Sequence, residues 1–519
     1  MNGRFVSLVL ALLACAPLAG AAAAGSRHVV VVVFDGMRPD FVTAETTPNL
    51  WALAQRGVFF ASHHPVYLSA TEVNGVAMAT GTYGARSLVI ANTDYRPLID
   101  PQKSVGIEKP ENVRKGDEMS GGHYLAVPTV AEILHAHGLA TAIAGAKQVA
   151  LLHDRAVRAG GPGVSPVLYE GAVMPSSLGS ALDSMLGTFP AVAADENKMA
   201  RDAWTTRALI GTLWKDAVPA YSLLWLAEPD ASQHATGPGT TQALAAIKSS
   251  DTNLGLVLAE LEKRGLRDST DVLVVSDHGF STISRKVDVA GELSKAGLDA
   301  KREVPGRLQP GEVLAVSNGG STLLYVGGHD AAVCRRLVAT LQEQDWTGVI
   351  FAREPAEGTF PLSEAHIDSP QAADFVVALR WDREKNSNGT AGRIVSDFAS
   401  ATAKLGNHAS LSAYDMHNTL VAAGPGFRRG VSNPLPSANL DLAPTILWLL
   451  GLRDEAAKMD GRVLGEALSG DAPPLKTFEL KRLTSRRETA AGTWEQYLQV
   501  SEVNGVRYLD EGNGALQPR

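Results

Sequence analysis

Cysteine is scarce in this sequence, which has two, Cys15 and Cys334, among its 519 residues. Cys15 lies in an N-terminal segment that we expect to be removed, so the mature chain would keep one cysteine and no internal disulfide. The fold must then be held by a hydrophobic core or by bound metal. Because 45% of the residues are hydrophobic, the chain is long enough to bury a large core.

Long hydrophobic runs and excess positive charge are also missing. No apolar run beyond the N-terminus approaches the ~20 residues that span a bilayer, which excludes a multi-pass membrane protein. The 47 Lys and Arg residues against 55 Asp and Glu give a net charge of −8, and the one dense basic stretch is Lys476–Arg487. This charge pattern gives no support for a nucleic-acid scaffold. A small anionic substrate still fits, since a bound metal reverses the charge locally.

The N-terminus has the pattern of a secretory signal peptide. Arg4 precedes the apolar run Phe5–Ala14, and a tract of small residues follows. We assign residues 1–24 to the signal peptide and expect an exported protein, periplasmic or secreted. Leu12–Cys15 also resembles a lipoprotein signal, which would place a lipid anchor on Cys15; ordinary cleavage is the alternative.

Apolar, β-branched runs alternate with helix-like segments along the rest of the chain. The run His28–Phe34 predicts a buried parallel strand. Similar runs occupy residues 221–226, 272–276 and 419–423. Helices are predicted between them at 48–57, 128–137, 242–264 and 440–450. The pattern predicts an α/β fold with a mostly parallel sheet and helices on both faces.

The pattern weakens between residues 281 and 401. Gly and Pro interrupt it there, and shorter strands are predicted at 322–326 and 375–379. We interpret this stretch as an inserted cap subdomain within a catalytic domain of residues 25–470. The polar tail, residues 471–519, is expected to be a C-terminal extension that either docks on the domain or is partly disordered.

The first two predicted strands are followed by residues that can bind a metal. Asp35 comes directly after the first strand, at the edge where α/β sheets hold their ligands. Asp230 and His234 follow the second strand. They are four residues apart, so a helical turn would bring both side chains to one cation.

The third and fourth strands add further candidates. Asp277 and His278 follow the third strand; adjacent residues on an extended chain point in opposite directions, so this pair can bridge two metals or serve them separately. His408 precedes the fourth. Each residue alone has an ordinary explanation, such as capping a helix. Three carboxylates and three histidines at one sheet edge, however, would be electrostatically costly without cations. The set suits two Zn²⁺ ions, with Mn²⁺ as an alternative that only geometry would separate.

Thr71 is the candidate nucleophile. The segment Ser69–Gly81 predicts a turn leading into a short helix, with Thr71 near the helix N-terminus, where N–H groups and the helix dipole favour an oxyanion. On this segment alone a helix cap is the simpler interpretation. Beside two metals, a threonine hydroxyl loses its proton more easily and can attack phosphorus.

The order of these residues resembles the alkaline phosphatase superfamily, and within it the nucleotide pyrophosphatase/phosphodiesterase branch. The matching motifs are Asp35, Thr71, Asp230-x-x-x-His234, Asp277-His278 and Gly-x-His408. The resemblance covers most of residues 28–452, and the stretches 412–427 and 439–445 are similar to the family's closing strand and helix. It implies an alkaline-phosphatase-like sandwich fold.

The resemblance also implies roles for single residues. One zinc would be held by Asp35, Thr71, Asp277 and His278, and the other by Asp230, His234 and His408. Thr71 would form a covalent phosphothreonine intermediate. Asn92 falls where the family keeps an asparagine that donates to a phosphoryl oxygen, although a turn asparagine is the alternative. Ala409 replaces a family glycine and His417 lies nearby, and we prefer His408 to His417 as the ligand.

The implied function is a two-zinc hydrolase of small phosphorylated substrates, at phosphodiester or pyrophosphate bonds. Two departures affect the substrate. Glu72-Val73-Asn74-Gly75 replaces the branch's usual Phe-Pro-Asn-His, and the missing Phe would help to line a base-stacking pocket. Lys147 falls where related phosphate monoesterases carry Lys-x-Arg, with Val149 at the arginine position. A broad phosphomonoesterase that uses Lys147 is therefore the alternative function, and a surface lysine is the ordinary explanation of that residue.

Three other classes are disfavoured. A sulfatase needs a Cys or Ser in a Cys/Ser-x-Pro-x-Arg context, which the segment after Thr71 does not offer. A phosphomutase on the same scaffold would be intracellular, whereas this chain carries an export signal. A binding protein with a degenerate site would lack one of the expected ligands, and all of them are present.

Overall fold

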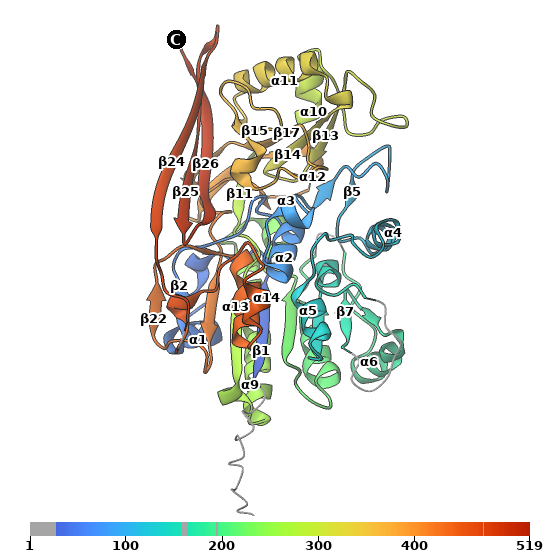
Figure 1. The fold of residues 1–519 in the computed structure, drawn as a ribbon, viewed down its shortest axis with the longest axis vertical. Helices are drawn as coiled ribbons and strands as arrows, with labels where there is room; N and C mark the ends of the chain where they lie inside the picture. Colours follow the sequence, from blue (N-terminus) through green and yellow to red (C-terminus); the bar gives the residue numbers. More distant parts are fainter. Residues whose placement is uncertain (1–26, 157–164, 194–195, 402, 471) are drawn as a thin grey trace, which may run out of the picture.

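The computed structural model describes residues 27–156, 165–193, 196–401, 403–470 and 472–519 (Figure 1). The predicted signal peptide, residues 1–24, and Cys15 therefore lie outside the described residues. Within the described part of the chain, no helix combines the length and the apolar character needed to cross a membrane.

A nine-stranded sheet forms the centre of the main domain. Its order is β22 (Val431–Asn433), β2 (Val58–Phe60), β21 (Leu420–Ala423), β10 (Thr270–Val275), β1 (His28–Phe34), β9 (Tyr221–Leu226), β6 (Thr141–Gly145), β7 (Val167–Tyr169) and β8 (Ala172–Met174). Strands β10, β1, β9, β6 and β7 run parallel, whereas β21 runs antiparallel to β10. The predicted α/β class with a mostly parallel sheet is confirmed.

Helices cover both faces of this sheet, which is why β1 needs a continuous apolar run. Valines 29, 31 and 33 of β1 face one core, and Val30, Val32 and Phe34 face the opposite one. The first core includes side chains of α2 (Thr71–Thr80), α5 (Val130–Ala136) and α13 (Leu442–Leu449). The second includes side chains of α1 (Pro48–Arg56), α7 (Met199–Ala208) and α9 (Thr241–Lys263). The predicted helices correspond to α1, α5, α9 and α13.

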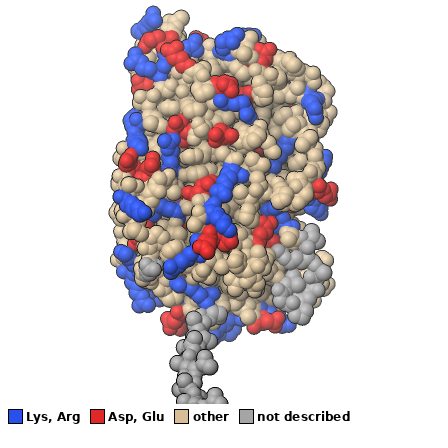
Figure 2. Space-filling view, viewed as in Figure 1, with Lys and Arg blue, Asp and Glu red and all other residues tan. Residues whose placement is uncertain are grey.

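Further elements accompany these layers. They are α3 (Gly84–Ser87), α4 (Pro110–Ser120), α6 (Gly179–Leu186), α8 (Asp230–Thr236) and α14 (Arg453–Ala456), with the strand pairs β4 (Thr93–Asp94) with β5 (Val105–Gly106) and β3 (His63–His64) with β23 (Ser437–Ala438). On the face shown in Figure 2, basic and acidic side chains are interspersed.

The stretch predicted as a cap contains a second sheet. Its six strands are β12 (Asp299–Lys301), β13 (Glu312–Ser317), β14 (Ser321–Val326), β17 (Phe375–Leu379), β15 (Thr347–Ala352) and β16 (Phe360–Pro361). One face packs on α10 (Val289–Lys295) and α11 (Ala331–Glu343). The other face, through Val316, Leu323 and Phe351, belongs to the same core as α2. The second sheet is thus built onto the main domain (Figure 1).

A four-stranded sheet links the two parts of the chain. It consists of β18 (Trp381–Lys385), β19 (Ala391–Asp397), β11 (Ser281–Val287) and β20 (Gly406–Asn407), and α12 (Phe398–Ala401) follows β19. The pairing of Ser281 with Asn407 brings the loop that carries His408 next to the end of β10.

The C-terminal tail forms a docked three-stranded antiparallel sheet. Its strands are β24 (Phe478–Glu488), β25 (Gly492–Val503) and β26 (Val506–Pro518), which run alongside both sheets in Figure 1. Leu498, Val500 and Tyr508 are buried in the main core. The Tyr508 hydroxyl donates to Asp441 at 2.9 Å, and the Ile350 N–H donates to Gln496 at 2.8 Å. The described residues of the tail, 472–519, thus pack against the main domain.

Candidate active site

The predicted ligands meet at the carboxyl edge of the central sheet in two groups of three. Asp35, Asp277 and His278 form the first group, and Asp230, His234 and His408 form the second. In each group, one ligand atom from every residue lies within 4.8 Å of the others. The rings of His278 and His408 stack with centroids 3.6 Å apart, so the two groups are neighbours. His417 lies in neither group.

The first group is fully buried. Asp35 directly follows β1, and Asp277 and His278 follow the adjacent β10, so parallel strand ends bring them together. His278 Nε2 lies 3.3 Å from Asp277 Oδ2 and 3.7 Å from Asp35 Oδ1. Gly36 turns the chain after β1 with a φ of +71°, and a Cβ there would lie 3.2 Å from that of Asp230. Glycine therefore lets the two groups approach each other.

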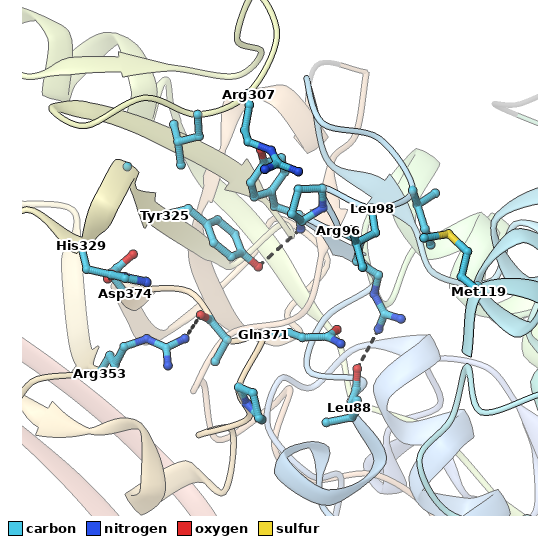
Figure 3. A pocket seen from close by; sticks show the side chains of 18 of the residues that line it. Leu88, Arg96, Leu98, Met119, Arg307, Tyr325, His329, Arg353, Gln371 and Asp374 are labelled. Atoms are coloured by element: carbon cyan, nitrogen blue, oxygen red, sulfur yellow. Dashed lines mark hydrogen bonds and ion pairs between the residues drawn. The ribbon is translucent and has the colours of Figure 1, made fainter. Parts of the chain in front are cut away.

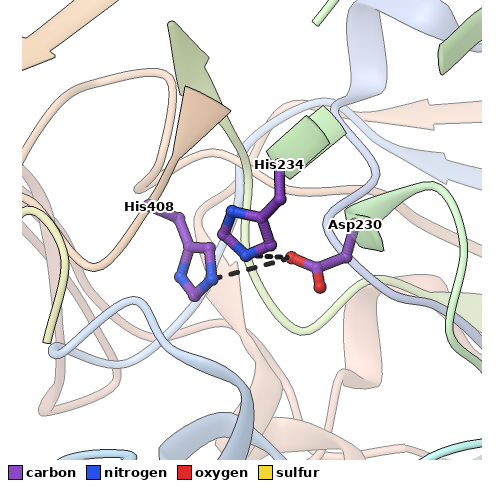
Figure 4. Close-up of side chains that lie close together, drawn as sticks. All are labelled: Asp230, His234 and His408. Carbon is purple, nitrogen blue, oxygen red and sulfur yellow. Dashed lines mark ion pairs between the residues drawn. The ribbon is translucent and has the colours of Figure 1, made fainter. Parts of the chain in front are cut away.

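The second group is assembled from a helix and a loop (Figure 4). Asp230 and His234 lie on α8, one turn apart as predicted, and His234 Nε2 is 3.2 Å from Asp230 Oδ1. His408 Nε2 lies 3.6 Å from the same oxygen. His408 precedes β21, and because β21 is antiparallel to β10, the segment before it lies at the metal-binding edge.

Hydrogen bonds fix all three imidazoles in the form that binds a metal. The Nδ1 atoms of His234, His278 and His408 lie 3.0, 2.8 and 2.9 Å from the backbone carbonyl oxygens of Gly406, Gly279 and Ser69. A carbonyl can only accept, so Nδ1 must carry the proton and Nε2 keeps its lone pair. This is the usual outer-shell arrangement of metal-binding histidines.

The carboxylates also fit cations. Asp35 Oδ1, Asp230 Oδ1 and Asp277 Oδ2 are buried and accept no hydrogen bond, and these are the oxygens that face the imidazoles. The other carboxylate oxygen of Asp35 and of Asp277 does accept a hydrogen bond. Asp35 Oδ2 accepts from the Trp225 indole N–H at 2.8 Å, and Asp277 Oδ1 accepts from the Gly36 N–H at 3.0 Å. Buried oxygens without donors are costly unless a cation binds them. The donor set thus fits one divalent cation in each group.

Burial and crowding shift the pKa values of these groups. Burial, with the neighbouring Asp277 carboxylate, raises the pKa of Asp35 well above its usual range. Burial would also raise the pKa of Asp230, but the positive charge of Lys147 opposes it and holds that pKa well below its usual range. Burial lowers the pKa of His234 and, together with His278, that of His408, which keeps both imidazoles neutral and able to bind metal.

Thr71 is the first residue of α2 and faces the first group. Its Oγ1 lies 3.3 Å from His278 Nε2 and lines a cavity of about 220 Å³ together with Asn92, Lys147 and residues of the second group. Asn92 Oδ1 accepts the backbone N–H of Glu72 at 2.9 Å. With its oxygen held in this way, the Asn92 amide nitrogen is the end left to donate to a ligand in the cavity.

Lys147 bridges the two groups. Its Nζ lies 2.8 Å from Asp35 Oδ2 and 3.3 Å from Asp230 Oδ2. Burial would lower the pKa of Lys147, but the carboxylates of Asp230 and Asp35 outweigh it and raise the pKa well above its usual value. Lys147 is therefore part of the site, whereas Val149, at the position of the second cation in the monoesterase pattern, is fully buried among apolar residues.

Several residues of the site were not predicted. Trp225 lies inside β9 and looks like core from sequence, yet its N–H orients Asp35. Asn74 holds the turn before Thr71 by donating to the carbonyls of Val66, Leu68 and Ala70. Lys404 Nζ lies 3.3 Å from His234 Nε2 and lines the cavity. Its position four residues before His408 was the one available signal.

A larger cavity, of about 640 Å³, lies away from these residues (Figure 3). It is formed between the segment from Leu88 to Tyr124 and the second sheet, and Arg96, Tyr325 and Arg353 line it. The Arg96 guanidinium donates to the Leu88 carbonyl at 2.7 Å, and Arg353 contacts the Ala372 carbonyl. None of the predicted site residues lines it. The candidate active site is therefore identified by the residues that line the smaller cavity, and not by the volume of the cavity.

The fold and the paired ligand groups define a member of the alkaline phosphatase superfamily. The sequence model of the type I phosphodiesterase/nucleotide pyrophosphatase family matches residues 29–390. The chain belongs to this family.

Individual relatives are distant. The bis(5′-adenosyl)-triphosphatase enpp4 of Xenopus laevis is 24% identical over 258 residues, which cover 49% of this chain and 48% of that protein. Ectonucleotide pyrophosphatase/phosphodiesterase family member 7 of Rattus norvegicus is 23% identical over 298 residues, covering 56% and 58%. The chain thus spans about half the length of these curated relatives.

A solved structure is similar in fold. Murine ectonucleotide pyrophosphatase/phosphodiesterase 5 superposes with a TM-score of 0.56 at 18% identity, covering 82% of this chain and 95% of that chain. At this identity the likeness supports the fold class.

Proposed function

We propose that the protein is a two-zinc hydrolase of phosphoric esters that cleaves phosphodiester or pyrophosphate bonds through a covalent phosphothreonine intermediate at Thr71. The observation that carries the proposal is the pair of three-residue ligand groups beside the Thr71 hydroxyl. Each group has buried carboxylate oxygens that accept no hydrogen bond, and its imidazoles are held with the proton on Nδ1, so that Nε2 keeps its lone pair. The family match supports the same class of reaction.

Two zinc ions in these groups would supply Lewis-acid activation of the nucleophile and stabilisation of the leaving oxygen. The chain's own residues do the rest. Thr71 Oγ1 attacks phosphorus as the bond to the leaving oxygen breaks, and water then hydrolyses the phosphothreonine and restores the hydroxyl. The Asn92 amide donates to a non-bridging phosphoryl oxygen, where negative charge builds up in the transition state.

The alternative is a broad phosphomonoesterase in which Lys147 neutralises the extra charge of a monoester. The contact of Lys147 with both ligand groups supports a role in the site. The apolar, buried Val149 weighs against the full Lys-x-Arg arrangement. Phosphodiester or pyrophosphate hydrolysis is therefore the function we favour.

The deciding experiment compares kcat/KM of the purified, zinc-loaded protein for p-nitrophenyl phosphate, bis-p-nitrophenyl phosphate and thymidine 5′-monophosphate p-nitrophenyl ester. Each is measured beside Thr71→Ala and the matched Thr71→Ser. We expect a diester preference, a loss of about 10³-fold or more in Thr71→Ala, and partial activity in Thr71→Ser, which keeps a hydroxyl. A monoester preference would establish the alternative function. Activity that is unchanged in Thr71→Ala would refute the nucleophile assignment.

We also propose that the protein is exported, to the periplasm or the medium, after removal of residues 1–24. The basis is the Arg4 and apolar-run pattern of the N-terminus. Mass spectrometry of the mature N-terminus tests this: a start near residue 25 supports ordinary cleavage, a lipid-modified Cys15 supports a lipoprotein, and an intact Met1 contradicts export.

A further inference from the structure

Asn439 lies next to the first ligand group. It is the first residue of a short 3₁₀ helix, Asn439–Asp441, that leads into α13, and its side chain is completely buried. An asparagine at the start of a helix commonly caps that helix. The side chain of Asn439 instead forms four hydrogen bonds with other segments of the chain. These bonds therefore serve the tertiary structure around the site and not the helix.

The amide nitrogen of Asn439 connects two segments of the candidate active site. Asn439 Nδ2 donates to the backbone carbonyl oxygen of Asp277 at 2.7 Å and to Asn74 Oδ1 at 3.0 Å. Asp277 belongs to the first ligand group, and Asn74 lies on α2, three residues after Thr71. One side chain thus joins the segment that follows β10 to the helix that begins with the candidate nucleophile.

Asn74 extends this connection to the turn that precedes Thr71. Its side chain donates to the carbonyl oxygens of three residues of that turn, which are Val66, Leu68 and Ala70. The same side chain accepts the backbone N–H of the first of them at 2.8 Å. The turn is therefore fixed to Asn74, and Asn74 is fixed to Asn439. Thr71 follows the turn directly, so a shift of the turn would change the 3.3 Å separation between Thr71 Oγ1 and His278 Nε2.

The amide oxygen of Asn439 is also held, which fixes the direction of the amide. Asn439 Oδ1 lies 3.0 Å from His63 Nε2 and accepts a hydrogen bond from Asn418 Nδ2 at 3.3 Å. Because a carbonyl oxygen only accepts, His63 carries its proton on Nε2, and its Nδ1 accepts from the Ser437 hydroxyl at 2.9 Å. Burial lowers the pKa of His63 to about 3, which keeps this imidazole neutral. The Asn439 amide cannot turn over without placing its NH₂ group against the His63 N–H and its oxygen against the Asp277 carbonyl.

We propose that Asn439 is a positioning residue of the candidate active site, which holds the Thr71 hydroxyl beside the first ligand group by joining Asn74 to the Asp277 carbonyl. This deepens the proposed function and rests on it. Asn439 does not line the cavity that contains Thr71, so it acts through the two segments that it connects. A displaced hydroxyl would slow the attack on phosphorus and leave substrate binding unchanged, because a misplacement of about 1 Å can cost about 10²-fold in rate.

The test compares Asn439→Ala with the matched control Asn433→Ala. Asn433 is also a buried asparagine, but it lies in the edge strand β22, and its side chain bonds to Glu466 and to the Leu435 N–H. We expect Asn439→Ala to lower kcat for bis-p-nitrophenyl phosphate by about 10²-fold, with KM and zinc content each changed by less than about twofold. Asn433→Ala should lower Tm, because it loses buried hydrogen bonds, and should leave kcat within about twofold.

Orthovanadate gives a readout that does not depend on turnover. Vanadium takes a fifth oxygen ligand and then resembles the transition state of attack by a hydroxyl, whereas inorganic phosphate stays tetrahedral. Calorimetric titration of the zinc-loaded protein should show that Asn439→Ala weakens orthovanadate binding by about tenfold or more and changes phosphate binding by less than about twofold. An equal change for the two anions would overturn the positioning role.

Two variants of His63 keep the proposal testable if Asn439→Ala does not fold. His63→Leu removes the N–H that holds Asn439 Oδ1, whereas the amide of His63→Gln can donate in place of Nε2. We expect about a tenfold loss of kcat in His63→Leu and recovery to within about threefold of the original kcat in His63→Gln, at unchanged zinc content. Equal losses in these two variants, or a loss of kcat in Asn433→Ala that matches that of Asn439→Ala, would overturn the inference. Activity that persists in Thr71→Ala would instead overturn the proposed function, so the two failures are distinguishable.

Discussion

The two ligand groups differ in how they meet solvent. In the first group Asp35, Asp277 and His278 are completely buried, and Trp225 and the Gly36 N–H hold the two carboxylates. In the second group the His234 side chain is 15% exposed and borders a surface cleft of about 540 Å³. In the proposed function, the buried first group would hold the Thr71 nucleophile rigidly, and the more exposed second group would face the leaving group.

The largest expected effect comes from removing one ligand of each group. Asp277→Asn and His408→Asn should each lose one of two zinc equivalents and at least about 10³-fold in kcat/KM. The two variants should also differ in how they depend on the leaving group. Asp277→Asn should slow p-nitrophenyl and phenyl diesters alike, whereas His408→Asn should slow the phenyl ester more, because a poor leaving oxygen depends more on stabilisation. Equal slowing of both esters in His408→Asn would break the comparison.

Metal removal should destabilise the fold, mainly through the first group. Without cations, its buried carboxylates keep unpartnered oxygens. At zinc concentrations about 10³ times Kd, the metal contributes about 4 kcal/mol to the free energy of unfolding per site. Calorimetry with and without a chelator should show a lower Tm in the metal-free protein, restored by zinc. An unchanged Tm would mean that the groups do not bind metal in the folded state.

The Trp225→Phe variant tests the buried first group without replacing any of its candidate metal ligands. The change keeps the ring in the core and removes the N–H that donates to Asp35. We expect a 10–100-fold loss in zinc affinity or activity, as is typical for outer-shell partners. Trp214→Phe, which removes a buried indole N–H bound to Ser222, is the matched control and should leave zinc affinity unchanged. Equal losses of zinc affinity in the two variants would mean that Trp225 acts only through packing in the core.

The smallest effect is expected for Lys147→Met. The variant keeps most of the side-chain volume and removes the charge between Asp35 and Asp230. We expect about a tenfold loss for p-nitrophenyl phosphate and a smaller loss for bis-p-nitrophenyl phosphate, because the monoester carries the extra negative charge. A uniform loss on both substrates would assign Lys147 to holding the ligand groups together.

The fold and most of the candidate metal-binding residues were predictable because they follow simple patterns. Asp35, Asp230 and Asp277 each follow a strongly apolar strand, and parallel strand ends must meet at one edge. Strand β6 was missed because Thr141–Gly145 is short and rich in small residues. The three C-terminal strands were missed although Gly492–Val503 alternates buried and exposed residues, because polar side chains dominate the tail.

The remaining site residues could not be found because their role depends on tertiary contacts. Trp225 is indistinguishable from a core residue until its N–H is seen to reach Asp35 from a neighbouring strand. Lys404 lies in a segment without helical or strand periodicity, and its nearness to His234, 170 residues away, follows from the position of β20 beside β11.

The central claim is that Thr71 becomes covalently phosphorylated during turnover. It is tested most directly by acid-quenching the zinc-loaded protein during hydrolysis of bis-p-nitrophenyl phosphate and mapping its peptides by mass spectrometry. The account predicts a nitrophenyl-phosphoryl adduct on the peptide that contains Thr71, and no adduct in Thr71→Ala. Turnover with no adduct on that peptide, or an adduct at another residue, would contradict it.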